Sequence, residues 1–118
     1  MEDIEERLEG LIEEINTKQI LVIVEGKKDL KALEELGIEK IYPINRKPIY
    51  KVIDEINEKE VLILTDLDQT GKELYSVLKS GLQNKGIKIN NNLRNFLFKT
   101  EIRQIEGITH YILKKQGL

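Results

Sequence analysis

The sequence lacks cysteine altogether, which excludes disulfide bonds, thiolate metal sites and cysteine nucleophiles. It has no apolar run near the roughly 18 residues of a membrane span. Its amino terminus, residues 1–6, is acidic where a secretory signal would be basic and then apolar. Tryptophan is absent, and the two phenylalanines and four tyrosines form no aromatic cluster in the sequence for stacking on bases. We therefore expect a cytoplasmic protein with no membrane partner.

What the chain does contain is typical of a soluble globular domain. Its 118 residues are 34% charged and 40% hydrophobic, and a chain of this length can bury a core of its own. The apolar side chains are mostly isoleucine, leucine and valine, which suit a buried sheet. We predict a single domain over residues 1–118.

The net charge of −2 is unevenly distributed along the chain. Residues 1–16 contain seven acids and one arginine, a net charge of −6. Residues 85–118 contain seven lysines and arginines and two acids, a net charge of +5. A basic carboxyl-terminal third could face phosphates, but solvated charged faces explain the pattern equally well.

Apolar residues recur at two periods that alternate along the chain. Short continuous apolar runs, typical of parallel strands covered on both faces, occupy 20–24, 40–44, 61–64 and, weakly, 87–89. Helical spacing occupies 2–16, 29–36, 48–56 and 70–86, with one or two further helical stretches between 91 and 115. This alternation predicts a three-layer, Rossmann-like α/β fold with a mostly parallel four-stranded sheet. We divide it into an amphipathic helix (1–17), an α/β core (18–90) and a basic helical segment (91–118).

Three acidic residues follow two of the expected strands. Glu25 comes directly after the run 20–24, and Asp66 and Asp68 follow the run 61–64. Ligands of open α/β sheets bind beyond the carboxyl ends of the strands, so the three carboxylates converge if these strands are neighbours. Carboxylates that close repel one another unless a cation lies between them or one stays protonated. Carboxylate oxygens favour Mg²⁺ or Mn²⁺, although a single Asp after a strand is more often a helix cap.

Two short motifs carry a resemblance to a known family. Residues 24–29, Val-Glu-Gly-Lys-Lys-Asp, resemble the Glu-Gly-x-x-Asp motif of Toprim domains. Residues 65–71, Thr-Asp-Leu-Asp-Gln-Thr-Gly, resemble the Asp-x-Asp-x-x-Gly motif of the same domains. Topoisomerases, bacterial primases, OLD-family nucleases and the maturase of 5S ribosomal RNA share this domain. The whole chain is most similar to small stand-alone, primase-like archaeal Toprim proteins and to the Toprim half of the maturase.

The resemblance implies a Toprim fold and a division of roles among the acids. Glu25 matches the family's general acid or base, and Asp66 and Asp68 match the aspartates that coordinate Mg²⁺. The implied function is Mg²⁺-dependent phosphodiester chemistry on RNA or DNA, by a nuclease or nucleotidyl transferase, with structured RNA as the preferred substrate. The alternative is a non-catalytic module that binds metal and nucleic acid within a larger protein or ribonucleoprotein complex.

Four basic residues are candidates for binding substrate phosphates. Lys27 and Lys28 lie beside Glu25 at the start of an expected helix, where backbone N–H groups already favour anions. Arg46 and Lys47 lie in the loop after the second expected strand, on the same sheet edge as the acids. For each of the four, an ordinary solvated surface position is the competing explanation.

Three residues of the motifs are supporting candidates. Asp29 matches an acid of the first motif but is equally suited to capping a helix. Gly26 and Gly71 belong to the two motifs, and Gly71 would permit close approach of backbone or ligand. His110, the only histidine, loosely resembles part of the maturase downstream of its Toprim motifs, and we assign it no role.

Two phosphoryl-transfer families offer rival interpretations of residues 66–70. The segment Asp-Leu-Asp-Gln-Thr also resembles the nucleophile motif of haloacid-dehalogenase phosphatases. That chemistry needs a further acidic pair, and the acids after residue 70 are only Glu73, Glu101 and Glu106. Response-regulator receivers place their acidic pair after the first strand and a single aspartate after the third, which is the reverse of the order here. Both interpretations are weaker than the Toprim one.

Overall fold

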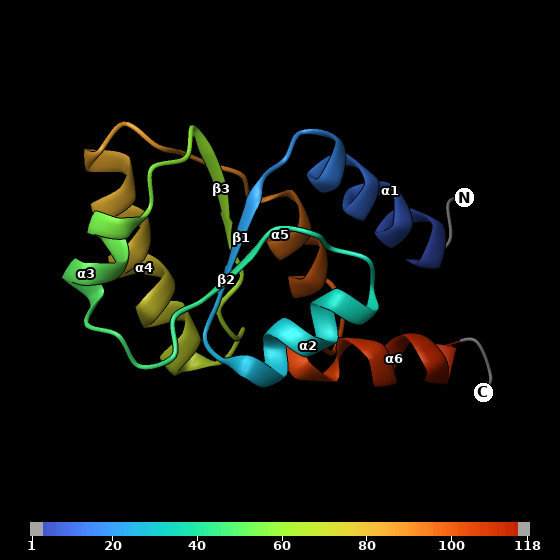
Figure 1. The fold of residues 1–118 in the computed structure, drawn as a ribbon. Helices are drawn as coiled ribbons and strands as arrows, with labels where there is room; N and C mark the ends of the chain where they lie inside the picture. The colour runs from blue at the N-terminus through green and yellow to red at the C-terminus, as the bar shows by residue number, and fades with distance from the viewer. Residues whose placement is uncertain (1–3, 116–118) are drawn as a thin grey trace.

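A computed structural model describes residues 4–115 of the chain. Strands and helices alternate along it (Figure 1). The elements are α1 (Ile4–Thr17), β1 (Leu21–Val24), α2 (Lys27–Glu35), β2 (Ile41–Pro43), α3 (Ile49–Glu55), β3 (Glu60–Ile63), α4 (Gln69–Asn84), β4 (Lys88–Ile89), α5 (Asn92–Phe98), the 3₁₀ turn η1 (Ile105–Gly107) and α6 (Ile108–Lys115). The expected α/β fold is confirmed.

The four strands form one parallel sheet in the order β2-β1-β3-β4. The first and third strands are therefore direct neighbours, with Val22 aligned to Leu62 and Ile23 to Ile63. Both are central, and every residue of β1 is buried. Their carboxyl ends lie side by side, which is the condition under which the acids of the two motifs converge.

Helices cover both faces of the sheet, as expected. One core lies between the sheet and α1, α2, α5 and α6, and the other lies between the sheet and α3 and α4 (Figure 1). Alternate strand residues point to the two cores: Val22, Val24, Leu62 and Leu64 to the first, and Leu21, Ile23, Val61 and Ile63 to the second. Each such side chain contributes about 1.5–3 kcal/mol by its burial. The central strands are thus a rigid base for the residues that follow them.

The observed elements differ from the expected ones mainly at their ends. Helix α2 begins at Lys27, two residues before the expected start, because the carbonyl of Gly26 already accepts a hydrogen bond from the N–H of Leu30. The segment after residue 90 contains α5, η1 and α6, and these pack on the sheet face that α1 and α2 also cover. The expected helix start at Glu2 lies outside the described residues. Within residues 4–115, no helix combines the length and apolar character needed to cross a membrane.

Candidate functional site

A hydrogen bond between the two motifs lies at the centre of the site. Glu25 follows β1 and Asp66 follows β3. The carboxylate Oε2 of Glu25 accepts a hydrogen bond of 2.8 Å from the backbone N–H of Asp66. The structure thus brings together two of the acids that the sequence selects, although they are 41 positions apart.

The two aspartates are also held by backbone donors. Asp66 Oδ1 accepts a hydrogen bond of 2.8 Å from the N–H of Ile105 in η1. Asp68 is the N-cap of α4, and its Oδ1 accepts from the N–H of Gly71 at 2.8 Å. Each carboxylate thus uses one oxygen to fix its own orientation. Asp68 is both the cap that a strand-end aspartate usually provides and a member of the acidic site.

Gly71 permits the close approach that the motif predicts. A β-carbon at this position would collide with the backbone carbonyl of Asp66. The hydroxyl of the buried Thr65 donates to the Gly71 carbonyl at 2.7 Å. The loop between β3 and α4 is therefore folded tightly against the first turn of α4. Gly26 differs, because a β-carbon there would meet open space and its backbone is extended.

A buried arginine that the sequence analysis does not select supports this loop from α5. Arg94 is only 3% exposed. It donates from Nη1 to the carbonyl of Thr65 at 2.6 Å and from Nη2 to the carbonyl of Asp66 at 3.2 Å. Its guanidinium lies 4.4 Å from the ring centre of Tyr75 and 5.3 Å from that of Phe98.

Burial and neighbouring negative charges raise the pKa values of Glu25, Asp66 and Asp29 above their usual ranges. Burial raises the pKa of Glu25, and the nearby charges of Asp66 and Asp68 raise it further, while the hydrogen bond from Asp66 opposes the shift. Burial likewise raises the pKa of Asp66, with Asp68 and Glu106 adding to the effect. The pKa of Asp29 rises to about 6, again chiefly through burial, although the N–H of Gly26 donates to its carboxylate at 3.1 Å. This mutual repulsion is what a bound cation or a shared proton would relieve.

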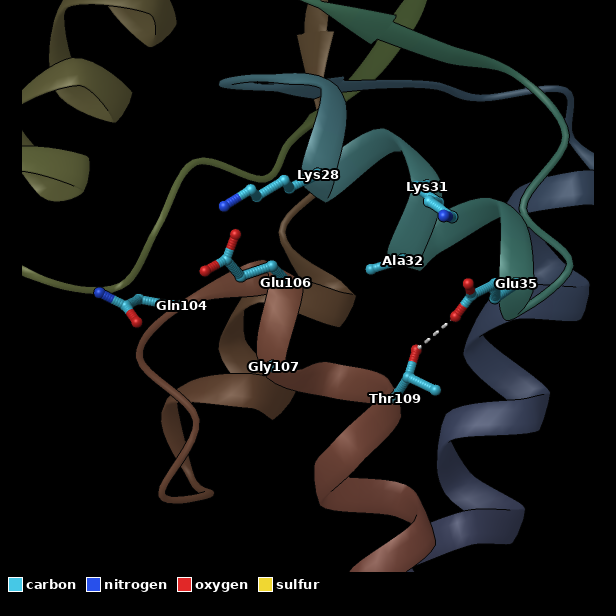
Figure 2. A pocket seen from close by; sticks show the side chains of 8 residues that line it. All are labelled: Lys28, Lys31, Ala32, Glu35, Gln104, Glu106, Gly107 and Thr109. Carbon is cyan, nitrogen blue, oxygen red and sulfur yellow. Dashed lines mark hydrogen bonds between the residues drawn. The ribbon is translucent and has the colours of Figure 1, made fainter.

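Glu106, in η1, is a further acid that the sequence analysis does not select for the site. It lines a cavity of about 470 Å³ between α2 and the η1–α6 segment. Figure 2 shows the side chains of Lys28 and Glu106 extending to the same end of this cavity. At the other end the hydroxyl of Thr109 donates to Glu35 at 3.4 Å. The cavity adjoins the acidic site, because the charge of Glu106 acts on both Asp29 and Asp66.

The four candidate phosphate-binding residues differ in their surroundings. Lys27 and Lys28 are exposed at the first turn of α2, next to Glu25. Arg46 is exposed in the loop after β2, which is fixed to the site because the N–H of Asn45 donates to the Glu25 carbonyl at 3.0 Å. Lys47 instead forms an ion pair of 3.0 Å with Glu55 on α3. Lys47 is therefore already paired with an acid of α3.

The donor set suits a hard cation with few protein ligands. Within residues 4–115, no group of three or more His, Cys, Asp or Glu side chains is arranged to hold a metal ion. Mg²⁺ in proteins is commonly held by only one or two carboxylates and keeps several waters. Asp66 and Asp68 would supply such a pair, and the charge of Asp68 contributes to the raised pKa of Asp66. The metal assignment stays a prediction.

His110 lies on α6, in the segment that follows η1. It is exposed and lines a separate cavity of about 250 Å³ together with Arg103 and Lys114. Arg103 also connects this region to the site, because its carbonyl accepts a hydrogen bond of 2.7 Å from the N–H of Leu67. The structure gives His110 no place among the acids.

Fold and site together define an α/β protein whose carboxylates gather beyond the ends of two parallel strands. A UPF0292 protein of Methanocaldococcus jannaschii is 38% identical over 119 residues, covering 93% of each chain. A UPF0292 protein of Pyrococcus horikoshii is 35% identical over 104 residues, covering 86% of this chain and 79% of the relative. This chain belongs to the UPF0292 family.

The same architecture occurs in a solved structure of a protein from Aquifex aeolicus. The two chains are 30% identical and superpose with a TM-score of 0.77, over 90% of this chain and 98% of the other. No protein-family model matches the sequence. The solved structure shows the same fold in another organism, and the names of the relatives state no activity.

Proposed function

We propose that this protein carries out Mg²⁺-dependent phosphodiester chemistry on nucleic acid in the cytoplasm, as a nuclease or nucleotidyl transferase that prefers structured RNA. The observation that carries the proposal is the hydrogen bond between Glu25 and the N–H of Asp66, which joins the two motifs at neighbouring strand ends. The resemblance of both motifs to Toprim domains supports the same reaction class. Because a fold hosts many functions, we infer the reaction class from the residues of the site.

The residues divide the work according to their surroundings. Asp66 and Asp68 would hold Mg²⁺, which supplies charge neutralisation at phosphoryl oxygens when bound. Glu25 would move a proton to or from the reacting oxygen. Its raised pKa suits this role, because an acid or base works best when its pKa is near the working pH. Lys27, Lys28 and Arg46 would bind the flanking phosphates.

A second function, recognition without catalysis, is favoured by one specific observation. Glu25 already uses one carboxylate oxygen to accept a hydrogen bond from the backbone N–H of Asp66. In this alternative, Glu25 stabilises the loop, and the metal and basic residues hold nucleic acid for a larger protein or ribonucleoprotein complex. The two functions use the same residues and differ in whether a bond is cut.

The test is cleavage of labelled structured RNA, single-stranded DNA and double-stranded DNA with Mg²⁺ or Mn²⁺. The variant is the double substitution Asp66→Asn and Asp68→Asn. Asparagine keeps an oxygen that can accept from the N–H groups of Ile105 and Gly71, so the loop is retained while both charges are lost. The matched control is Asp54→Asn, an exposed acid on α3.

We expect metal-dependent cutting by the wild type and the Asp54 variant, and none by the double variant. Cutting that persists in the double variant, or without divalent metal, contradicts the proposed site. A wild type that binds Mg²⁺ and RNA but cuts none of the substrates supports the binding module instead.

A further inference from the structure

Arg94 is a buried charge whose position calls for an explanation. Arginine is almost never fully buried without partners, because removing its charge from water is costly. Here the exposed fraction is 3%, and the guanidinium donates two hydrogen bonds to backbone carbonyls of the site loop. A positive charge that is buried beside an acidic site, despite the cost of removing it from water, is well suited to fixing that loop.

The geometry of these bonds suits a guanidinium. Nη1 and Nη2 reach the carbonyls of two successive residues, Thr65 and Asp66. A planar fork can hold two acceptors in a fixed relation, whereas the ammonium of lysine is a point charge on a flexible chain. The rings of Tyr75 and Phe98 hold the fork from α4 and α5. The orientations of the Thr65–Asp66 and Asp66–Leu67 peptide groups are therefore set from α5.

The orientation of these peptide groups determines two other contacts of Asp66. The N–H of Asp66 points to Glu25, and its carboxylate accepts from the N–H of Ile105. If the carbonyls of residues 65 and 66 turned, both contacts would be lost together. The guanidinium of Arg94 donates to the carbonyls of this loop, so it fixes the loop, while its charge lowers the pKa of Glu25 and of Asp66.

We propose that Arg94 is a positioning residue that fixes the loop of Asp66 and thereby sets the affinity of the site for Mg²⁺. The inference rests on the proposed function for the metal, while its effect on the loop does not. Groups that orient metal ligands typically change metal affinity by about 10- to 100-fold when substituted. The positive charge of Arg94 would by itself oppose a nearby cation, so positioning and charge predict opposite effects.

The experiment uses the full chain and three variants, with Mg²⁺ binding measured by titration calorimetry. Arg94→Lys keeps the charge and loses the fork, and Arg94→Met loses both. Tyr75→Phe is the matched control, because it keeps the ring beside Arg94 and loses only the hydroxyl that donates to Asn91 at 2.7 Å. Hydrogen exchange of the Asp66 and Leu67 amides, measured without metal, reports the loop independently of any activity.

We expect both Arg94 variants to bind Mg²⁺ at least about 10-fold more weakly and to exchange the Asp66 and Leu67 amides faster, while the amides of Ile23 and Ile63 stay protected. Tyr75→Phe should match the wild type. Wild-type affinity in Arg94→Lys, or tighter binding in Arg94→Met, overturns the inference.

A wild type that binds no Mg²⁺ is a different result. It rejects the metal of the proposed function, and the exchange of the two loop amides then decides the role of Arg94 alone. If neither Arg94 variant folds, Phe98→Leu decides, because it removes one of the two rings and keeps Arg94. Weaker binding or faster loop exchange is expected there, and wild-type values for both overturn the inference.

Discussion

The Glu25 carboxylate accepts a 2.8 Å hydrogen bond from the backbone N–H of Asp66. This bond connects the segments that directly follow β1 and β3. The last three residues of each strand are buried. Two properties of the Glu25 side chain can be separated here. The bond needs an oxygen that accepts a hydrogen bond, whereas proton transfer needs a group that ionises. A substitution that keeps the first property and removes the second can therefore tell a structural role from a catalytic one.

The first prediction concerns Glu25. Glu25→Gln keeps an oxygen for the Asp66 N–H, so its unfolding free energy should change by less than about 1 kcal/mol. Its cleavage rate should fall by about 10²- to 10⁴-fold, because the amide cannot transfer a proton. Glu25→Ala should also lose about 1–3 kcal/mol of stability, since a partly buried N–H is left without its acceptor. Urea unfolding and single-turnover cleavage measure the two effects, and full activity in Glu25→Gln would remove Glu25 from the chemistry.

The second prediction compares the glycines of the two motifs. Gly71→Ala places a methyl group against the carbonyl of Asp66 and should destabilise the protein by about 1–3 kcal/mol, as overpacking usually does. Gly26→Ala is the matched control, because its methyl group meets open space and its stability should stay within about 0.5 kcal/mol of the wild type. Thermal and urea unfolding of both variants measure the difference. Equal losses in the two would mean that the loop moves away from α4 without cost.

The sequence predicts the framework of the site because two of its signals are local. The apolar runs of β1 and β3 and the acids directly after them lie within a few residues of one another. The parallel pairing of those strands then brings Glu25 and Asp66 together. Nothing beyond strand order is needed for that step, so the acids of both motifs could be selected before the structure was known.

Arg94 and Glu106 could not be selected in the same way, because long-range packing brings them to the site. Arg94 reaches the loop through the docking of α5 beside β3, and Glu106 reaches it through η1 beside α2. One signal was present for Arg94. It lies between the buried Leu93 and Leu97 on a short helix, where a charged side chain must find partners inside the protein. Glu106 is exposed, and its local sequence carries no comparable signal.

The third prediction follows from the raised pKa of Asp29. Its pKa in the folded protein is about 6, against 3.8 for an unperturbed aspartate. The folded state therefore binds this proton more tightly than the unfolded state, and the contribution to stability is present below about pH 4 and lost as the pH rises through 6. Asp29→Asn should consequently be more stable than the wild type at pH 7.5, by about 1–2 kcal/mol, and the difference should shrink at pH 5.

Urea unfolding at the two pH values measures this difference. The asparagine oxygen can still accept from the N–H of Gly26, so the helix start is kept. Asp54→Asn controls for the loss of one negative charge at an exposed position. A stabilisation that is the same at pH 5 and pH 7.5 would show that ionisation of Asp29 is not its cause.

The last prediction separates the basic residues by their existing partners. Lys28 is exposed beside the acidic site, whereas Lys47 is paired with Glu55 at 3.0 Å. Lys28→Ala should therefore reduce the salt dependence of RNA binding by about 0.7–0.9 in the log–log slope, the contribution of one phosphate contact. Lys47→Ala should leave the slope unchanged. Fluorescence anisotropy with a structured RNA over a range of salt concentrations measures both.

Arg46 allows a sharper version of this test. Its φ is +66°, in the left-handed region that glycine adopts without strain. Arg46→Gly should therefore keep the loop conformation, with a stability equal to or above that of the wild type, while losing one phosphate contact and the matching part of the salt slope. A slope that falls for Lys47→Ala but not for Lys28→Ala or Arg46→Gly would place the nucleic acid over α3 and away from Glu25. The acids at the strand ends would then lie outside the substrate's path, and the proposed chemistry would lose its site.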